Sequence, residues 1–144
     1  MKVTDKDIIA MRDLASRLNL VGKDRLFDNS PELIAKVCNG IGPEWFPAAI
    51  RAAIDRLHPS LKVVAMIHDL DYYFGDGTTE DFNKANSAFA ANGIVVADDR
   101  YKWYDPRRYL ARRSARKFAA LCAVGGRVAY NKAIRDRQME VNMT

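Results

Sequence analysis

The stretch MIHDLDYYF, residues 66 to 74, places a histidine directly beside an aspartate within an otherwise apolar run. On a helix, His68 and Tyr72 are one turn apart and share a face, whereas Asp69 points about 100° away. A neutral imidazole can act as a general base, and a carboxylate can bind a hard cation. The pair therefore suits the activation of water beside a carbonyl that a metal ion polarises. The alternative is a hydrogen-bonded core histidine beside an exposed aspartate.

A second segment, CNGIGP at 38 to 43, spaces two glycines so that the backbone can turn tightly and point successive carbonyls inward. Such a loop can ligate calcium through main-chain oxygens. It lacks the third glycine of a dinucleotide site and the lysine of a P-loop. Glycine-rich turns of this kind also commonly precede helices, so the segment alone does not define a metal site.

A third segment, DFNKANSAF at 81 to 89, reads as a helix whose packing stripe includes Ala85 and Phe89. Asn86 follows Ala85 at the border of this stripe, where its side chain can reach a neighbouring helix. An asparagine in a helix is otherwise usually a solvent-facing residue.

The elements that must position these segments are predicted to be helices, which makes the chain all-α. Cys38 to Gly42 should interrupt one helix, Asn92-Gly93 should end another, and IVVA at 94 to 97 is a strand-like run too short to build a sheet. Caps and apolar spacing predict helices from Thr4 to about Leu18, from Ser30, from Pro43 to Leu57, from Ser60 to Phe74, from Thr78 or Thr79 to Ala91, and from Asp105 towards Gln138 with a kink at Gly125-Gly126.

The composition fits one domain over residues 1 to 144. A chain of 144 residues with 49% hydrophobic content can bury a core without help from metals or disulfides. Cys38 and Cys122 are expected to be reduced core thiols, with a single bridge as the alternative. The sequence shows no signal peptide and no transmembrane span, so we expect a protein that is cytoplasmic or carried in a virion.

Positive charge is concentrated in one segment. Eight of the 23 basic residues lie between Arg100 and Lys117, where Asp105 is the only acid, so this segment carries 8 − 1 = +7 and the remainder 5 − 7 = −2. A local basic patch suggests an anionic partner, either a membrane surface or nucleic acid. Trp103 and Tyr104 suit a lipid interface or stacking on bases. The alternative is a solvated helix face, with Tyr109, Leu110 and Phe118 turned to the core.

The three site segments together resemble the phospholipase A2 superfamily, over about a third of the chain. HDLDY at 68 to 72 matches the HDxxY motif of that family. CNGIG is similar to the short calcium loop of the insect and parvoviral branches, and FNKANSAF is similar to the parvoviral stretch that carries the second catalytic carboxylate. The order of the segments also agrees, and the closest motif match is to the disulfide-poor parvoviral-type branch.

This resemblance implies a single domain of about five to six helices built around two antiparallel site helices, with an N-terminal helix extension and a long basic C-terminal helix. It also implies calcium-dependent hydrolysis of phospholipid sn-2 esters. His68 would take a proton from the attacking water, Tyr72 would orient the residue on the partner helix, and the ion with the Gly40 region would stabilise the oxyanion. Calcium would be bound by the carbonyls of Cys38, Gly40 and Gly42 and by the carboxylate of Asp69.

The sequence departs from the family pattern at two places. Leu70 and Asp71 stand where secreted members have cysteines, which the parvoviral branch also lacks. Asn86 stands where an aspartate is expected, and an amide carries no charge to stabilise an imidazolium. In serine-protease triads the corresponding exchange costs about 10⁴ in rate. The resemblance therefore implies a weak or inactive enzyme, unless Asp71 or Asp81 supplies the carboxylate.

Two other functions fit the same residues. One is a non-catalytic phospholipase A2-like structural module, viral or toxin-associated, and the other is a basic helical protein that binds nucleic acid. For the enzyme we expect calcium as the cofactor, a phospholipid membrane surface as the partner, weak or no binding to nucleic acid, and a viral or prophage setting.

Overall fold

All regular secondary structure is helical in residues 2–40 and 47–143, the parts of the chain that the computed structural model describes. The all-α prediction is confirmed, although these residues form eight α-helices rather than five to six. None of these helices is both long and apolar enough to cross a membrane. The elements are α1 (Asp5–Arg17), α2 (Asp24–Phe27), α3 (Pro31–Gly40), α4 (Ala48–Asp55), the 3-10 helix η2 (Pro59–Leu61), α5 (Lys62–Tyr73), α6 (Thr79–Arg100), α7 (Pro106–Gly125) and α8 (Arg127–Met143).

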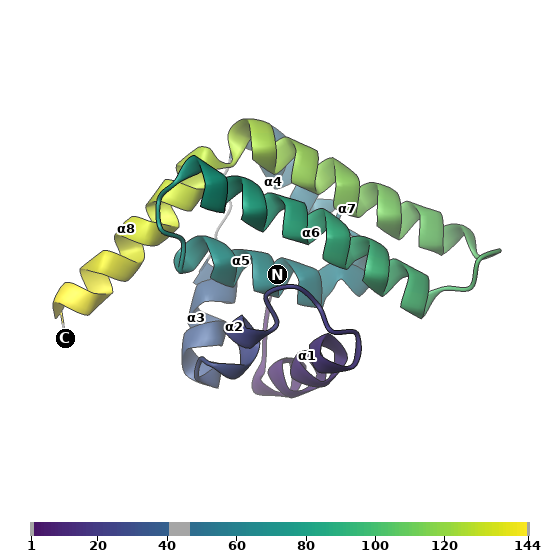
Figure 1. Ribbon diagram of the computed structural model, residues 1–144, viewed down its shortest axis with the longest axis horizontal. Coiled ribbons are helices and arrows are strands. Elements are labelled where there is room, and N and C mark those ends of the chain that lie inside the picture. The colour runs from purple at the N-terminus through teal and green to yellow at the C-terminus, as the bar shows by residue number, and fades with distance from the viewer. Residues whose placement is uncertain (1, 41–46, 144) are drawn as a thin grey trace.

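Helix α5 lies at the centre of the fold. It runs antiparallel to α6, and α7 returns alongside α6 to form the longest helix pair (Figure 1). Helices α1, α2 and α3 pack against α5 on the side away from α6 and α7, α4 packs against α7, and α8 crosses the end of α5. Every residue of α5 from Val63 to Leu70 is consequently buried. This helix carries the HD pair, so both polar side chains are placed in the interior.

Several predicted helix starts are confirmed by their capping contacts. Thr4 and Asp7 form a capping box at α1, the Thr78 hydroxyl caps α6, and the Asp105 carboxylate caps α7. The prediction that Ser60 caps α5 was wrong. The N-cap residue of α5 is Leu61, which makes no side-chain capping hydrogen bond. His58 instead caps the preceding 3-10 helix η2, because its Nδ1 accepts a hydrogen bond from the Ser60 backbone N–H.

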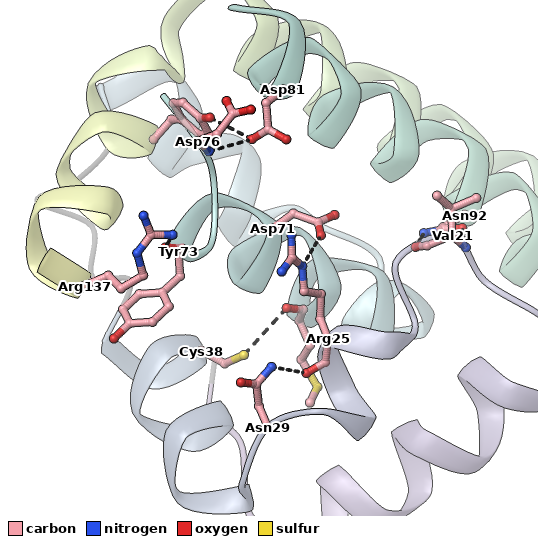
Figure 2. A network of polar contacts seen from close by, with 12 residues as sticks. Val21, Arg25, Asn29, Cys38, Asp71, Tyr73, Asp76, Asp81, Asn92 and Arg137 are labelled. Carbon is pink, nitrogen blue, oxygen red and sulfur yellow. Dashed lines mark hydrogen bonds and ion pairs between the residues drawn. The ribbon is translucent and has the colours of Figure 1, made fainter. Parts of the chain in front are cut away.

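Helix α6 continues past Asn92-Gly93, so the predicted stop at Ala91 and the strand-like reading of residues 94 to 97 were wrong. Asn92 is buried, and its side-chain amide makes two hydrogen bonds to the backbone of Val21, at 2.9 and 2.8 Å (Figure 2). A Cβ atom at Gly93 would lie 2.3 Å from Cβ of Ala115 on α7. These two residues resemble a helix end in sequence, but they serve contacts with other parts of the chain.

The basic C-terminal segment forms two helices rather than one kinked helix. Helix α7 ends at Gly125, and α8 begins at Arg127 and takes a different direction (Figure 1). A Cβ atom at Gly126 would lie 2.8 Å from the hydroxyl of Tyr72. The absence of a side chain at Gly126 therefore lets the α7–α8 junction lie against the centre of the fold.

We expect Gly93→Ala to lower the free energy of unfolding by about 1 to 3 kcal/mol, because the added methyl group overpacks the contact between α6 and α7. Urea unfolding followed by circular dichroism measures the loss. Ala115→Gly removes the opposing methyl group. The Gly93→Ala/Ala115→Gly double variant should therefore lose less stability than the sum of the single variants. Strict additivity would contradict this account of Gly93.

Candidate functional site

His68 lies in α5 and is enclosed by aromatic side chains. Only 1% of its surface is exposed. The rings of Phe89 on α6 and Phe118 on α7 meet the imidazole edge to face, with centroids 5.3 and 5.5 Å away. The ring of Tyr72, one turn along α5, lies 4.2 Å away. The imidazole is therefore shielded from bulk water by three helices.

Asn86 on α6 holds this imidazole in place. Its amide oxygen lies 2.9 Å from Nε2 of His68 and 2.7 Å from the hydroxyl of Tyr72, which donates to it. An amide oxygen can only accept, so Nε2 of the neutral imidazole carries the proton and Nδ1 keeps its lone pair. The structure thus brings together the three side chains that helical spacing placed on facing surfaces.

Asp71 and Asp81 do not take the place of Asn86. Asp71 forms an ion pair with Arg25 on α2, at 3.2 Å (Figure 2). Asp81 accepts a hydrogen bond from the hydroxyl of Tyr130 on α8, at 2.7 Å. The residue bonded to the imidazole is therefore uncharged.

Two buried nitrogen atoms of this cluster have no hydrogen-bond partner among the described residues. They are Nδ1 of His68 and Nδ2 of Asn86. Leaving a buried polar atom unpaired costs about 1–3 kcal/mol, and folded proteins contain few such atoms. The free Nδ1 is also the basic atom of the imidazole. The cluster therefore keeps a nitrogen lone pair that the fold itself does not use.

Burial lowers the pKa of His68 from 6.5 to about 4, and the hydrogen bond to Asn86 opposes this shift only in part. Desolvation penalises the charged imidazolium, and a neutral amide offers it little compensation. The imidazole is therefore neutral at pH 7, which is the protonation state that a general base requires.

Asp69 faces a cavity of about 440 Å³. It is 8% exposed, and no hydrogen bond or ion pair joins its carboxylate to another residue of the described ranges. Burial raises its pKa well above the usual aspartate value. Such a carboxylate favours either a proton or a cation. The cavity is lined by Lys2, Cys38, Ile54, Asp55, Leu57, His58, Pro59, Lys62, Ala65, Asp69 and Phe118.

The segment predicted to form a calcium-binding loop differs from that prediction at its first residues. Cys38 and Gly40 belong to the last turn of α3, so the prediction that the helix is interrupted from Cys38 was wrong, and Gly42 lies outside the described residues. Main-chain carbonyl oxygens and carboxylates are the types of ligand that calcium prefers. Cys38 also lines the Asp69 cavity. The carboxylate and these carbonyls therefore fit a hard cation in donor chemistry.

Side chains alone do not complete a metal site in the described parts of the chain. No group of three or more histidine, cysteine, aspartate or glutamate side chains there could hold an ion. Both cysteines are free and buried, in agreement with the expected reduced thiols.

Three residues of the site region were not identified from the sequence. Phe118 both lines the cavity and contacts the His68 ring, and His58 and Lys62 line the same cavity. Phe118 was expected in the core, but nothing in its spacing pointed to the histidine. His58 and Lys62 flank a turn whose sequence carries no motif, so only the fold reveals their position.

Searches against protein-family models, curated proteins and solved structures find no match for this chain.

We expect acid to destabilise the calcium-free protein in part through His68. Its pKa is about 4 in the folded state and 6.5 in the unfolded state, so the unfolded state binds more protons between these values. This contribution is complete above pH 6.5 and is lost as the pH falls towards 4. Asp69 acts in the opposite direction, because its raised pKa makes folding favour the protonated form.

The measurement is chemical unfolding of wild type and His68→Gln at pH 7 and pH 4.5 in the presence of a chelator. The stability advantage of the wild type over His68→Gln should shrink by on the order of 2 kcal/mol at the lower pH. An advantage that is the same at both pH values would contradict the lowered pKa.

Proposed function

We propose that the chain is a phospholipase A2-like hydrolase of phospholipid sn-2 esters, with calcium as its cofactor and a membrane surface as its partner. The observation that carries this proposal is the buried cluster in which Asn86 leaves Nδ1 of His68 basic and unpaired. Asp69, the next residue along α5, lines a cavity, and its carboxylate has no hydrogen-bond or ion-pair partner among the described residues. A base and a cation ligand in adjacent directions suit hydrolysis of an ester.

In this mechanism His68 accepts a proton at Nδ1 from the attacking water. Asn86 keeps the proton of the neutral imidazole on Nε2, and the Tyr72 hydroxyl fixes the orientation of the Asn86 amide. Asp69 and the carbonyls of Cys38 and Gly40 would hold calcium, which supplies Lewis acidity towards the ester carbonyl. Because Asn86 is neutral, the imidazolium formed in the step is poorly stabilised, so turnover should be slow.

The cavity also bears on access to the base. His68 itself does not line it, whereas Phe118 lines it and contacts the imidazole. The Phe118 ring therefore lies between the cavity lining and the imidazole as their shared contact. The same closure, together with the neutral Asn86, favours a second candidate function, a non-catalytic structural module with the same fold.

Calcium should raise the melting temperature of the wild-type protein by mass action. Asp69→Asn should abolish the shift, because it removes the only charged ligand of the proposed site. Differential scanning calorimetry in millimolar calcium measures this, with magnesium as the comparison ion. Asp55→Asn, at the rim of the same cavity, serves as a matched control and should keep the shift. Melting that is indifferent to calcium would remove the main support for a metal-dependent enzyme.

His68→Gln should eliminate ester hydrolysis while leaving the calcium-induced melting shift nearly intact, because glutamine has no basic nitrogen. Asn86→Asp should raise the rate of hydrolysis tenfold or more, since a carboxylate stabilises the imidazolium and still accepts both hydrogen bonds. Fatty-acid release from calcium-treated phospholipid vesicles measures both effects. Asn83→Asp, on the exposed face of α6, is the matched control. An unchanged or lower rate in Asn86→Asp would refute the proposed role of this residue.

A further inference from the structure

The turn between α6 and α7 exposes an unusual group of large apolar side chains. Trp103 is 71% exposed and Tyr104 62% exposed, and Tyr109 and Leu110 at the start of α7 are each more than half exposed. The expectation that Tyr109 and Leu110 face the core was therefore wrong. This turn forms one end of the molecule, and the C-terminal end of α8 lies at the opposite end (Figure 1). Exposed apolar groups gathered in one place mark an interaction surface.

The charges around this turn are only partly neutralised by the fold. Arg107 pairs with Asp105, and Arg108 and Arg112 both pair with Asp98. Of the eight basic residues in this segment, 8 − 3 = 5 thus form no ion pair with another described residue, and all of these are exposed. The five are Arg100, Lys102, Arg113, Arg116 and Lys117.

The free charges lie on the same surfaces as the apolar group. Lys102 lies in the turn, with its ammonium 5.9 Å from the Tyr104 ring centroid. Arg113 is one turn along α7 from Tyr109, and Arg116 and Lys117 continue the same exposed face. An apolar tip with unpaired cations beside it is complementary to an anionic lipid surface, where aromatic rings occupy the interface and cations meet the headgroups.

The turn is also connected to the candidate site. A second cavity, of about 700 Å³, is lined at one end by Arg100, Tyr101 and Arg107 from the α6–α7 region. It shares His58, Pro59 and Lys62 with the Asp69 cavity. The Asp69 cavity and the second cavity therefore share a wall, and residues at the α6–α7 turn line the second cavity.

We propose that the α6–α7 turn is a membrane anchor, in which Trp103 and Tyr104 enter the interface of an anionic bilayer and the five unpaired cations bind its headgroups. Any role of the anchor in bringing lipid to the Asp69 cavity rests on the proposed function. Membrane binding by the turn does not depend on it. A nucleic-acid surface fits less well. The Trp103 and Tyr104 rings meet edge to face at 85°, which does not form two parallel platforms for bases, and Leu110 adds apolar area without hydrogen-bonding groups.

The first test is co-sedimentation with phosphatidylglycerol vesicles in a chelator, compared with phosphatidylcholine vesicles. The wild type should bind the anionic vesicles, and added salt should weaken the binding. Trp103→Ala/Tyr104→Ala should reduce binding at least tenfold. Met139→Ala/Met143→Ala, which removes exposed apolar side chains at the opposite end, should leave it unchanged. Equal binding by both double variants would overturn the anchor.

Charge is tested with two triple variants of equal net charge. Arg113→Ala/Arg116→Ala/Lys117→Ala should weaken binding to anionic vesicles roughly 100-fold. Lys6→Ala/Arg51→Ala/Arg135→Ala removes three exposed cations from other helices and should have a much smaller effect. In a Trp45→Phe background, the emission of Trp103 should shift to shorter wavelength on vesicle binding. Equal losses in the two triple variants, or an unchanged emission, would contradict insertion at this turn.

A final comparison separates the anchor from the proposed hydrolase. With calcium, Trp103→Ala/Tyr104→Ala should lose hydrolysis of vesicles but retain hydrolysis of a dissolved short-chain phosphatidylcholine. Vesicle binding that depends on Trp103 without hydrolysis of either substrate would support the anchor and refute the hydrolase. Tight, salt-sensitive binding to DNA with indifference to vesicles would overturn the anchor and assign the five cations to a nucleic acid.

Discussion

The two hydrogen bonds accepted by the Asn86 amide oxygen are the constraint around which the structure is arranged. They join α5 to α6 through side chains that are almost fully buried, in a region where unpaired polar groups are costly. The aromatic residues around them exclude water, which strengthens both bonds. The same exclusion of water raises the free-energy cost of every buried polar atom that has no hydrogen-bond partner. His68 Nδ1 is one of those atoms, so the packing that secures the cluster also leaves this ring nitrogen without a hydrogen-bond partner among the described residues.

Burial shifts the pKa values of the neighbouring residues His68 and Asp69 in opposite directions. It disfavours charge on both, so it keeps the imidazole in its basic, neutral form and turns the aspartate towards its protonated form. A cation beside Asp69 would restore its negative charge. An anionic residue in place of Asn86 would likewise favour the imidazolium. Both groups are thereby shifted towards their uncharged forms, His68 by losing a proton and Asp69 by gaining one.

The sequence identified the contacts that depend on local helical geometry. The sequence was sufficient to predict that His68, Tyr72 and Asn86 lie together. His68 and Tyr72 are one helical turn apart, and a glycine-containing turn reverses the chain before Asn86. At Asn92-Gly93 the local preference for a helix end is overridden by contacts with α7 and with Val21, so the helix continues where the sequence predicts a stop. The cavity beside Asp69 could not be foreseen, because five separate elements contribute its walls.

The sequence separation of the central residues has a consequence for folding. His68 and Asn86 are 18 residues apart, and they belong to consecutive antiparallel helices joined by a short turn. Closing such a short segment costs little chain entropy, and local contacts generally form fast. We therefore expect the α5–α6 hairpin to assemble early. Phe118, which arrives with α7, would then complete the enclosure of the imidazole late in folding, after the polar cluster has formed in contact with solvent.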